Sequence, residues 1–97
     1  MMPDQEVKKL SAFLRKLLKK KHIVTKSRIL ECVTRLEKTH FLRMEDINWI
    51  LPFLQRIQPV DQIDSRDKVQ NYLSGFLHPE EASPNTLEEF LIDEYKA

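Results

Sequence analysis

The chain has 97 residues, 41% hydrophobic and 32% charged, a balance typical of one small folded domain and not of a disordered chain. Its single glycine, Gly75, argues against sheets with tight hairpins and against Gly-rich phosphate-binding loops. The single cysteine, Cys32, excludes an internal disulfide, and no apolar run approaches the roughly 20 residues of a membrane span. Because the start also lacks the apolar stretch of a signal peptide, we expect an intracellular protein, cytoplasmic or nuclear, with no membrane contact.

The net charge is +1, but the charged side chains are unevenly distributed along the chain. Residues 1–43 hold twelve Lys or Arg against four Asp or Glu, which gives +8. Residues 44–97 hold four against eleven, which gives −7. The sequence therefore predicts a basic surface from the first half and an acidic surface from the second.

Apolar residues at three- and four-residue steps predict an amphipathic helix from about Asp4 to His22. Its inward face holds Val7, Leu10, Phe13, Leu14, Leu17 and Leu18. The run from Lys19 to His22 is expected in its last turn, where cations oppose the partial negative charge of exposed carbonyl groups. This placement alone explains much of the lysine cluster.

A second helix is expected to start at an N-cap, Thr25 or Ser27, and to end near Thr39 or His40. Its apolar stripe holds Ile29, Leu30, Cys32, Val33 and Leu36. On this stripe the Cys32 thiol is expected to be buried, with a raised pKa that leaves it unreactive.

A third helix is expected to begin near Met44 and to turn an aliphatic stripe toward the core. That stripe holds Ile47, Ile50, Leu51, Leu54 and Ile57, with Trp49 and Phe53 flanking it. Pro52 lies inside this segment, where it removes a backbone donor at a cost on the order of 3 kcal/mol. A kink or break is therefore expected between Asn48 and Leu51.

A fourth helix is expected from about Asp61 to Leu77, and its apolar residues are Ile63, Val69, Tyr72, Leu73, Phe76 and Leu77. A linker that contains two prolines follows it. Thr86 and Glu89 form a capping-box pattern that opens a short acidic helix. One face of that helix holds Leu87, Phe90, Leu91 and Tyr95. The chain is thus predicted to be all-α, a compact bundle of four to five short helices over residues 1–78, with the linker and an acidic C-terminal helix over residues 79–97.

The sequence offers no constellation of catalytic or metal-binding residues. His22, His40 and Cys32 lie on different predicted elements, without metal-ligand spacing. Adjacent acids such as Glu45 and Asp46 point about 100° apart on a helix, so they are interpreted as solvated helix starts. We therefore expect no enzymatic activity, no metal and no cofactor.

The remaining candidates for function are surfaces that contact a partner. A basic face is predicted from Arg15, Lys16, Lys19, Lys20, Lys26 and Arg28, and an acidic face from Asp61, Asp64, Glu88, Glu89 and Asp93. Trp49 and Phe53 form a possible hydrophobic anchor, although the simpler interpretation places Trp49 in the core.

Residues 7–73 resemble a death-effector domain, the six-helix module of initiator caspases and their adaptors. The likeness rests on Leu36-Glu37-Lys38 at the end of a helix, on Ile47, Ile50, Leu54 and Ile57 in the next, and on Asp61 before the last. Leu10 with Phe13 and Leu14 resembles a Phe-Leu patch of the family, whose first helix has no counterpart before Val7. The resemblance implies an adaptor or regulator without catalysis that assembles signalling complexes, as in apoptosis regulation, through homotypic helical contacts.

Three functions remain open on the sequence. The first is an interaction module that binds another protein or a second copy of itself. The second is a nucleic-acid-associated factor whose basic residues contact phosphates. The third is a small helical subunit of a larger complex, with Trp49 and Phe53 at a docking groove. On any of them, the acidic tail is also able to fold back on Lys16 to Lys21 of its own chain.

Overall fold

The computed structural model describes residues 2–19, 23–56, 65–77 and 85–91. These residues form four α-helices and one short 3₁₀ turn, with no strand among them. The helices are α1 (Asp4–Leu18), α2 (Ile23–Thr39), α3 (Met44–Arg56) and α4 (Ser65–Ser74), and the turn is η1 (Leu87–Glu89). The prediction of an all-α bundle is confirmed.

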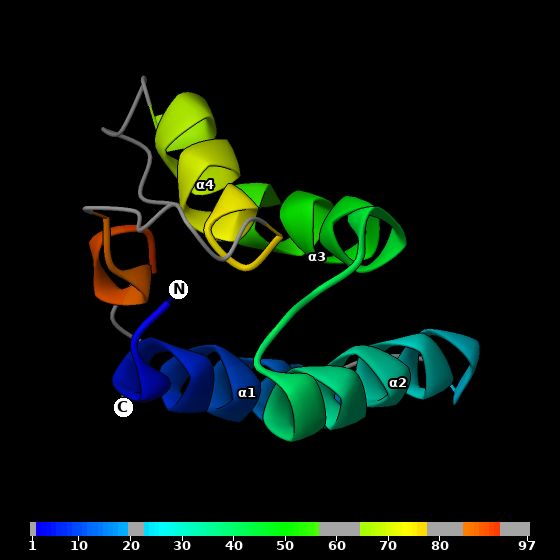
Figure 1. Cartoon of the computed structure of the whole chain (residues 1–97). Coiled ribbons are helices and arrows are strands. Elements are labelled where there is room, and N and C mark those ends of the chain that lie inside the picture. The colour runs from blue at the N-terminus through cyan, green and yellow to red at the C-terminus, as the bar shows by residue number, and fades with distance from the viewer. Residues whose placement is uncertain (1, 20–22, 57–64, 78–84, 92–97) are drawn as a thin grey trace.

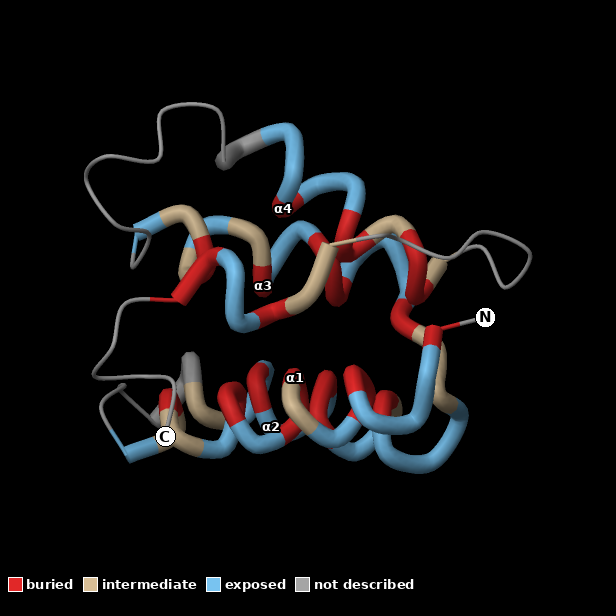
Figure 2. The backbone as a smooth tube through the Cα atoms, turned by 90° about the vertical axis from the view of Figure 1, so that its left-hand side faces the viewer, coloured by how far each residue is buried: buried red, intermediate tan, exposed pale blue. Residues whose placement is uncertain are grey.

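The four helices pack in two layers around one core. Helices α1 and α2 run side by side in opposite directions and form one layer, while α3 and α4 form the other (Figure 1). The turn η1 lies beside the N-terminal end of α1. Buried positions on the two layers face one another across the middle of the molecule (Figure 2).

The core is built largely from the predicted apolar stripes. The buried side chains of the two layers include Leu10, Phe13, Leu14, Leu17, Val33, Leu36, Ile50, Leu54, Tyr72, Leu73 and Phe76. The segment at η1 adds Leu87, Phe90 and Leu91 to the same core. Leu30 is an exception, because its side chain is 47% exposed and its predicted core position is wrong.

Two predicted helix ends differ from those observed. Helix α1 ends at Leu18, so the cations of its last turn are Arg15 and Lys16, while Lys19 caps the helix and residues 20–22 lie outside the described part. Helix α2 begins at Ile23, so the predicted N-caps Thr25 and Ser27 lie inside it. Inside a helix, Ser and Thr cost only about 0.5 kcal/mol relative to Ala, which is too little to set the helix start by themselves.

Helix α3 runs continuously through Pro52, so of the predicted kink or break before this residue, the break is wrong. Ile47 and Ile50 on one side and Leu54 on the other are all buried, and these core contacts hold both halves of the helix in place. Pro52 itself is exposed and has no N–H to offer the Asn48 carbonyl group.

The elements that follow α3 differ from the predicted ones. Helix α4 ends at Ser74, and residues 75–77 continue it as three turns of the i→i+3 type. Thr86 precedes η1 but its side chain makes no capping hydrogen bond, so the predicted capping box is wrong. Asp61 and Tyr95 lie outside the described residues, as does any helix after Leu91.

Candidate interaction surfaces

Helix α3 carries two apolar faces. One is buried in the core, and the other holds Trp49, Pro52, Phe53 and Arg56 at the i, i+3, i+4, i+7 spacing of a single helix face. These four residues and Asn48 line a surface hollow of about 370 Å³, called here the α3 groove. Trp49 is 37% exposed, so the simpler interpretation of Trp49 as a core residue is wrong.

Arg28 of α2 reaches across to the α3 groove. Its guanidinium carbon lies 5.3 Å from the centre of the Trp49 ring, within the range of a cation–π contact. This contact holds the indole ring against its neighbour and places a positive charge at the edge of the groove. Of the predicted basic face, Arg28 is thus the residue that meets the predicted hydrophobic anchor.

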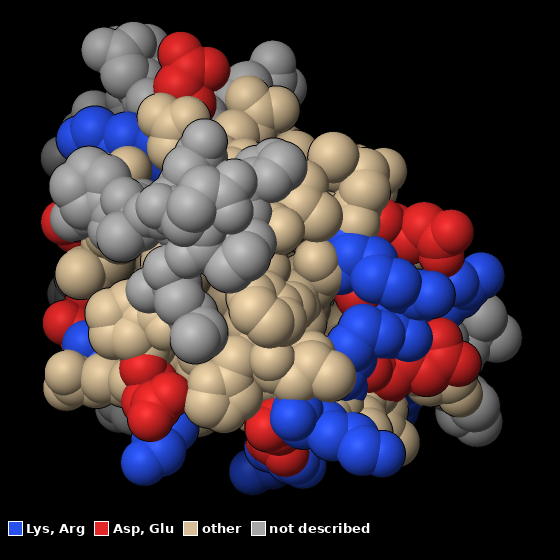
Figure 3. Space-filling view, in the orientation of Figure 1, with Lys and Arg blue, Asp and Glu red and all other residues tan. Residues whose placement is uncertain are grey.

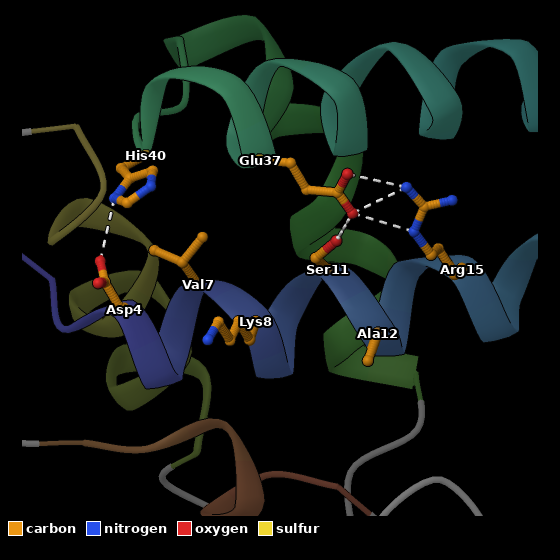
Figure 4. A pocket seen from close by; sticks show the side chains of 8 residues that line it. All are labelled: Asp4, Val7, Lys8, Ser11, Ala12, Arg15, Glu37 and His40. Atoms are coloured by element: carbon orange, nitrogen blue, oxygen red, sulfur yellow. Dashed lines mark hydrogen bonds and ion pairs between the residues drawn. The ribbon is translucent and has the colours of Figure 1, made fainter.

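A second hollow, of about 410 Å³, lies between α1 and α2, and Figure 4 shows the side chains that line it. Glu37 accepts hydrogen bonds there from the Ser11 hydroxyl and from two nitrogens of Arg15, the latter at 2.8–3.0 Å. The Ser11 and Arg15 hydrogen bonds lower the pKa of the Glu37 carboxyl. At the other end, His40 Nδ1 lies 3.2 Å from an Asp4 carboxylate oxygen. Arg15, a predicted partner contact, is therefore engaged within the chain.

Of the other predicted basic residues, Lys16 and Lys19 lie at the end of α1, and Lys26 lies in the first turns of α2. Lys16 and Lys26 are partly buried and Lys19 is exposed, while Lys20 lies outside the described residues. Blue and red side chains alternate over the right and lower right of the molecule in Figure 3. Arg35 and Arg43 each pair with acids of α3. In this view the basic side chains are interleaved with acidic ones.

The acidic C-terminal segment contacts α1 of the same chain. Lys9 Nζ lies 3.0 Å from Glu88 and 3.6 Å from Glu6, and the hydrogen bond to Glu88 raises the pKa of Lys9. Among the described residues, the ion pair to this segment is at Lys9. The predicted contact with Lys16 to Lys21 stays a prediction, because Lys20, Lys21 and residues 92–97 lie outside the described part. Glu89 is exposed beside Glu88. The predicted acidic contacts Asp61, Asp64 and Asp93 lie outside the described residues.

Two buried carboxylates, Glu6 and Asp46, connect the helices, and neither connection was predicted from the sequence. Glu6 of α1 accepts hydrogen bonds from the Tyr72 hydroxyl of α4 at 2.9 Å and from the Leu87 N–H at 3.3 Å. Asp46 of α3 is bound by Arg35 of α2, so its interpretation as a solvated helix start is wrong. Each acid is the third residue of its helix, where a carboxylate can accept hydrogen bonds from free backbone N–H groups. This position in the sequence was the signal that could have identified both acids as structural residues.

Cys32 is buried beside Asp46, and its thiol lies 3.4 Å from the carboxylate. Burial and the neighbouring negative charge raise the pKa of the thiol to about 12. The prediction of a buried cysteine with a raised pKa is confirmed.

No three His, Cys, Asp or Glu side chains of residues 2–19, 23–56, 65–77 and 85–91 gather as metal ligands would. Within those same ranges, every helix is too short or too polar to cross a membrane. Comparison with protein-family models, curated proteins and solved structures finds no match to the chain.

Proposed function

We propose that the protein is a non-catalytic interaction module, an adaptor or regulator that assembles a complex through its helical surfaces. One observation carries this proposal, namely that α3 uses one apolar face for the core and presents Trp49 on a second. Tryptophan in a hollow is frequent among the residues that dominate binding energy at protein interfaces. The resemblance to death-effector domains supports the same class of function.

The contacts that the basic side chains make within the chain favour a protein partner over nucleic acid. Arg15 is bound by Glu37, so one of the predicted phosphate contacts is used inside the chain, and Arg28 lies beside an aromatic ring and not among other cations. A phosphate-binding surface needs several cations free to meet the backbone together. The groove instead combines an aromatic ring with few charges, a mixture that suits a protein surface.

A capture experiment with matched variants tests this function. The immobilised full chain is incubated with extract of the source cells, and the retained proteins are compared for the wild type, Trp49→Ala and Met44→Ala. Met44 is the matched control, because it is 56% exposed on the same helix but does not line the groove. We expect the wild type and Met44→Ala to retain the same proteins and Trp49→Ala to lose them. Retention by all three chains alike, or by none, contradicts the proposal.

A further inference from the structure

We infer that the α3 groove binds an acidic amphipathic helix of a separate partner protein. In this arrangement an apolar side chain of the partner packs against Trp49, and its carboxylates meet Arg28 and Arg56. The inference deepens the proposed function and rests on it.

The charges around the groove favour an acidic partner. Arg56 is the charged residue among the five that line the groove, and Arg28 lies at its edge on the Trp49 ring. Neither arginine has an ion pair with a carboxylate within the described residues. Elsewhere in this part of the chain, Arg15, Arg35 and Arg43 are each paired with an acid. Within the described residues, the two arginines at the groove thus differ from those three in having no ion pair with a carboxylate, which a partner is expected to supply.

The shape of the groove favours a helix as the occupant. Trp49, Pro52, Phe53 and Arg56 follow one another along about two turns of α3, so the groove runs along the axis of a single helix. Partner helices lie in such grooves with their own apolar residues at i, i+3, i+4 and i+7. The described residues contain no strand edge on which an extended peptide could add.

Residues 85–91, the described part of the acidic segment, do not provide such a helix in a second copy of this chain. Their apolar side chains, Leu87, Phe90 and Leu91, are all buried in their own core. Of the acids in this range, Glu88 is already paired with Lys9. These described residues would bring charge without an apolar anchor, and we therefore assign the groove to a different protein.

Trp49 allows a direct binding test, because it is the only tryptophan of the chain. A synthetic amphipathic helical peptide without Trp or Tyr is made in three forms, with Glu, Gln or Lys at its flanking positions, and titrated into the full chain. We expect the Glu peptide to change the Trp49 emission and to bind roughly tenfold more tightly than the Gln peptide. Its affinity should fall as salt is added, and the Lys peptide should not bind.

Two variants of equal charge test where the peptide binds. The double variant Arg28→Glu with Arg56→Glu should reverse the order of the peptide affinities, so that the Lys peptide binds best. Lys8→Glu with Lys38→Glu changes the net charge by the same amount at exposed positions outside the groove, and it should leave the order unchanged. Equal reversal in both double variants would show a response to net charge alone and would overturn the inference.

The remaining outcomes separate this inference from the proposed function. Equal binding of the Glu and Gln peptides overturns the acidic partner, while a Trp49-dependent capture still supports an interaction module. If no peptide binds but capture depends on Trp49, the inference fails and the function stands. If light scattering finds a dimer that is lost in Arg28→Glu with Arg56→Glu, the groove belongs to a second copy, and the separate partner is overturned.

Discussion

The guanidinium group of Arg35 on α2 meets the carboxylate of Asp46 on α3 at 2.7 and 2.9 Å, with Asp46 almost fully buried. Asp46 also accepts a hydrogen bond from the backbone N–H of Arg43 at 3.0 Å, which satisfies a free donor at the start of α3. One carboxylate thus fixes both the beginning of α3 and its attachment to α2. Arg28 lies on α2 and Trp49 lies on α3. The Arg35–Asp46 ion pair, which joins these two helices, therefore also helps to hold Arg28 against Trp49 at the α3 groove.

Replacing Asp46 by Ala is expected to lower the free energy of unfolding by about 3 kcal/mol, because Arg35 and the Arg43 N–H lose their shared acceptor. Urea denaturation followed by circular dichroism measures this change. Glu45→Ala is the matched control, since Glu45 is exposed one residue earlier and its loss should cost at most about 0.5 kcal/mol. Equal losses in the two variants would contradict the role given to Asp46.

The same carboxylate predicts how stability depends on pH. Burial alone would raise the pKa of Asp46, but hydrogen bonds from the Arg43 N–H, Cys32 and Arg35 outweigh it and hold the pKa below the ordinary 3.8. A lowered pKa in the folded state means that the ionised group stabilises the fold above its unfolded pKa, and that this stability is lost as the pH falls through the folded pKa.

Below about pH 4 the wild type should therefore lose stability more steeply than Asp46→Asn. Urea titrations from neutral to acidic pH compare the two proteins. Glu37, whose pKa is also lowered, contributes in the same direction in both, so the variant should retain part of the slope. Parallel curves for the two proteins would rule out Asp46 as a source of the pH dependence.

Replacing Glu6 by Ala is expected to release residues 85–91 from the bundle. The buried Tyr72 hydroxyl and the Leu87 N–H would lose their common acceptor, which costs about 2–3 kcal/mol. Hydrogen exchange at the Leu87 and Phe90 amides should accelerate more than exchange within α2. Gln5→Ala, an exposed neighbour on the same turn, should leave both rates unchanged. Uniform acceleration in all helices would indicate general destabilisation and not release of this segment.

Apolar periodicity was sufficient to predict the helices and most of the core. The stripes around Leu14, Val33, Leu54 and Tyr72 repeat at helical spacing, and burial follows that spacing closely. The ends of the helices were harder to predict, because a capping residue such as Thr25 contributes less free energy than the packing of the helix against the core. Continuity through Pro52 was missed for the same reason, since the buried residues on both sides belong to a core that the local sequence does not describe.

The candidate site was only partly predictable. Trp49 was singled out by its type, but its exposure depends on which face of α3 meets the core, and that is decided by the other layer. The partners of Glu6, at Tyr72 and Leu87, lie 66 and 81 residues away in the sequence. Contacts over such separations follow from the packing of the layers, so neither spacing nor residue type indicates them.

Replacing Gly75 is expected to destabilise the protein because a side chain at this position would contact its neighbours too closely. The backbone conformation of Gly75 is not the reason. A Cβ atom at this position would lie 2.6 Å from the sulfur of the buried Met2 side chain and 3.2 Å from the Tyr72 carbonyl oxygen. Gly75→Ala should therefore lower the free energy of unfolding by about 1 kcal/mol. In a Met2→Ala background the same change should cost less, because only the approach to the Tyr72 carbonyl oxygen remains, and a double-mutant cycle by thermal denaturation measures the difference. Identical costs in both backgrounds would contradict the contact.

Replacing His40 by Gly is expected to stabilise the protein. His40 follows the last residue of α2 with a φ of 64°, and its N–H donates to the Leu36 carbonyl oxygen at 2.8 Å, so it closes the helix in the left-handed conformation. A side chain at such a position costs about 1 kcal/mol that glycine does not incur.

The change also removes the contact of His40 with Asp4, but both side chains are partly exposed, so this pair is worth little. His40→Gly should therefore raise the free energy of unfolding by about 0.5–1 kcal/mol in urea denaturation, whereas His40→Ala, which keeps the strain and loses the contact, should not. Asp4→Asn measures the contact by itself and should change stability by less than about 0.5 kcal/mol. A loss of stability in His40→Gly larger than that in Asp4→Asn would show that the histidine side chain stabilises the end of α2 by more than its contact with Asp4.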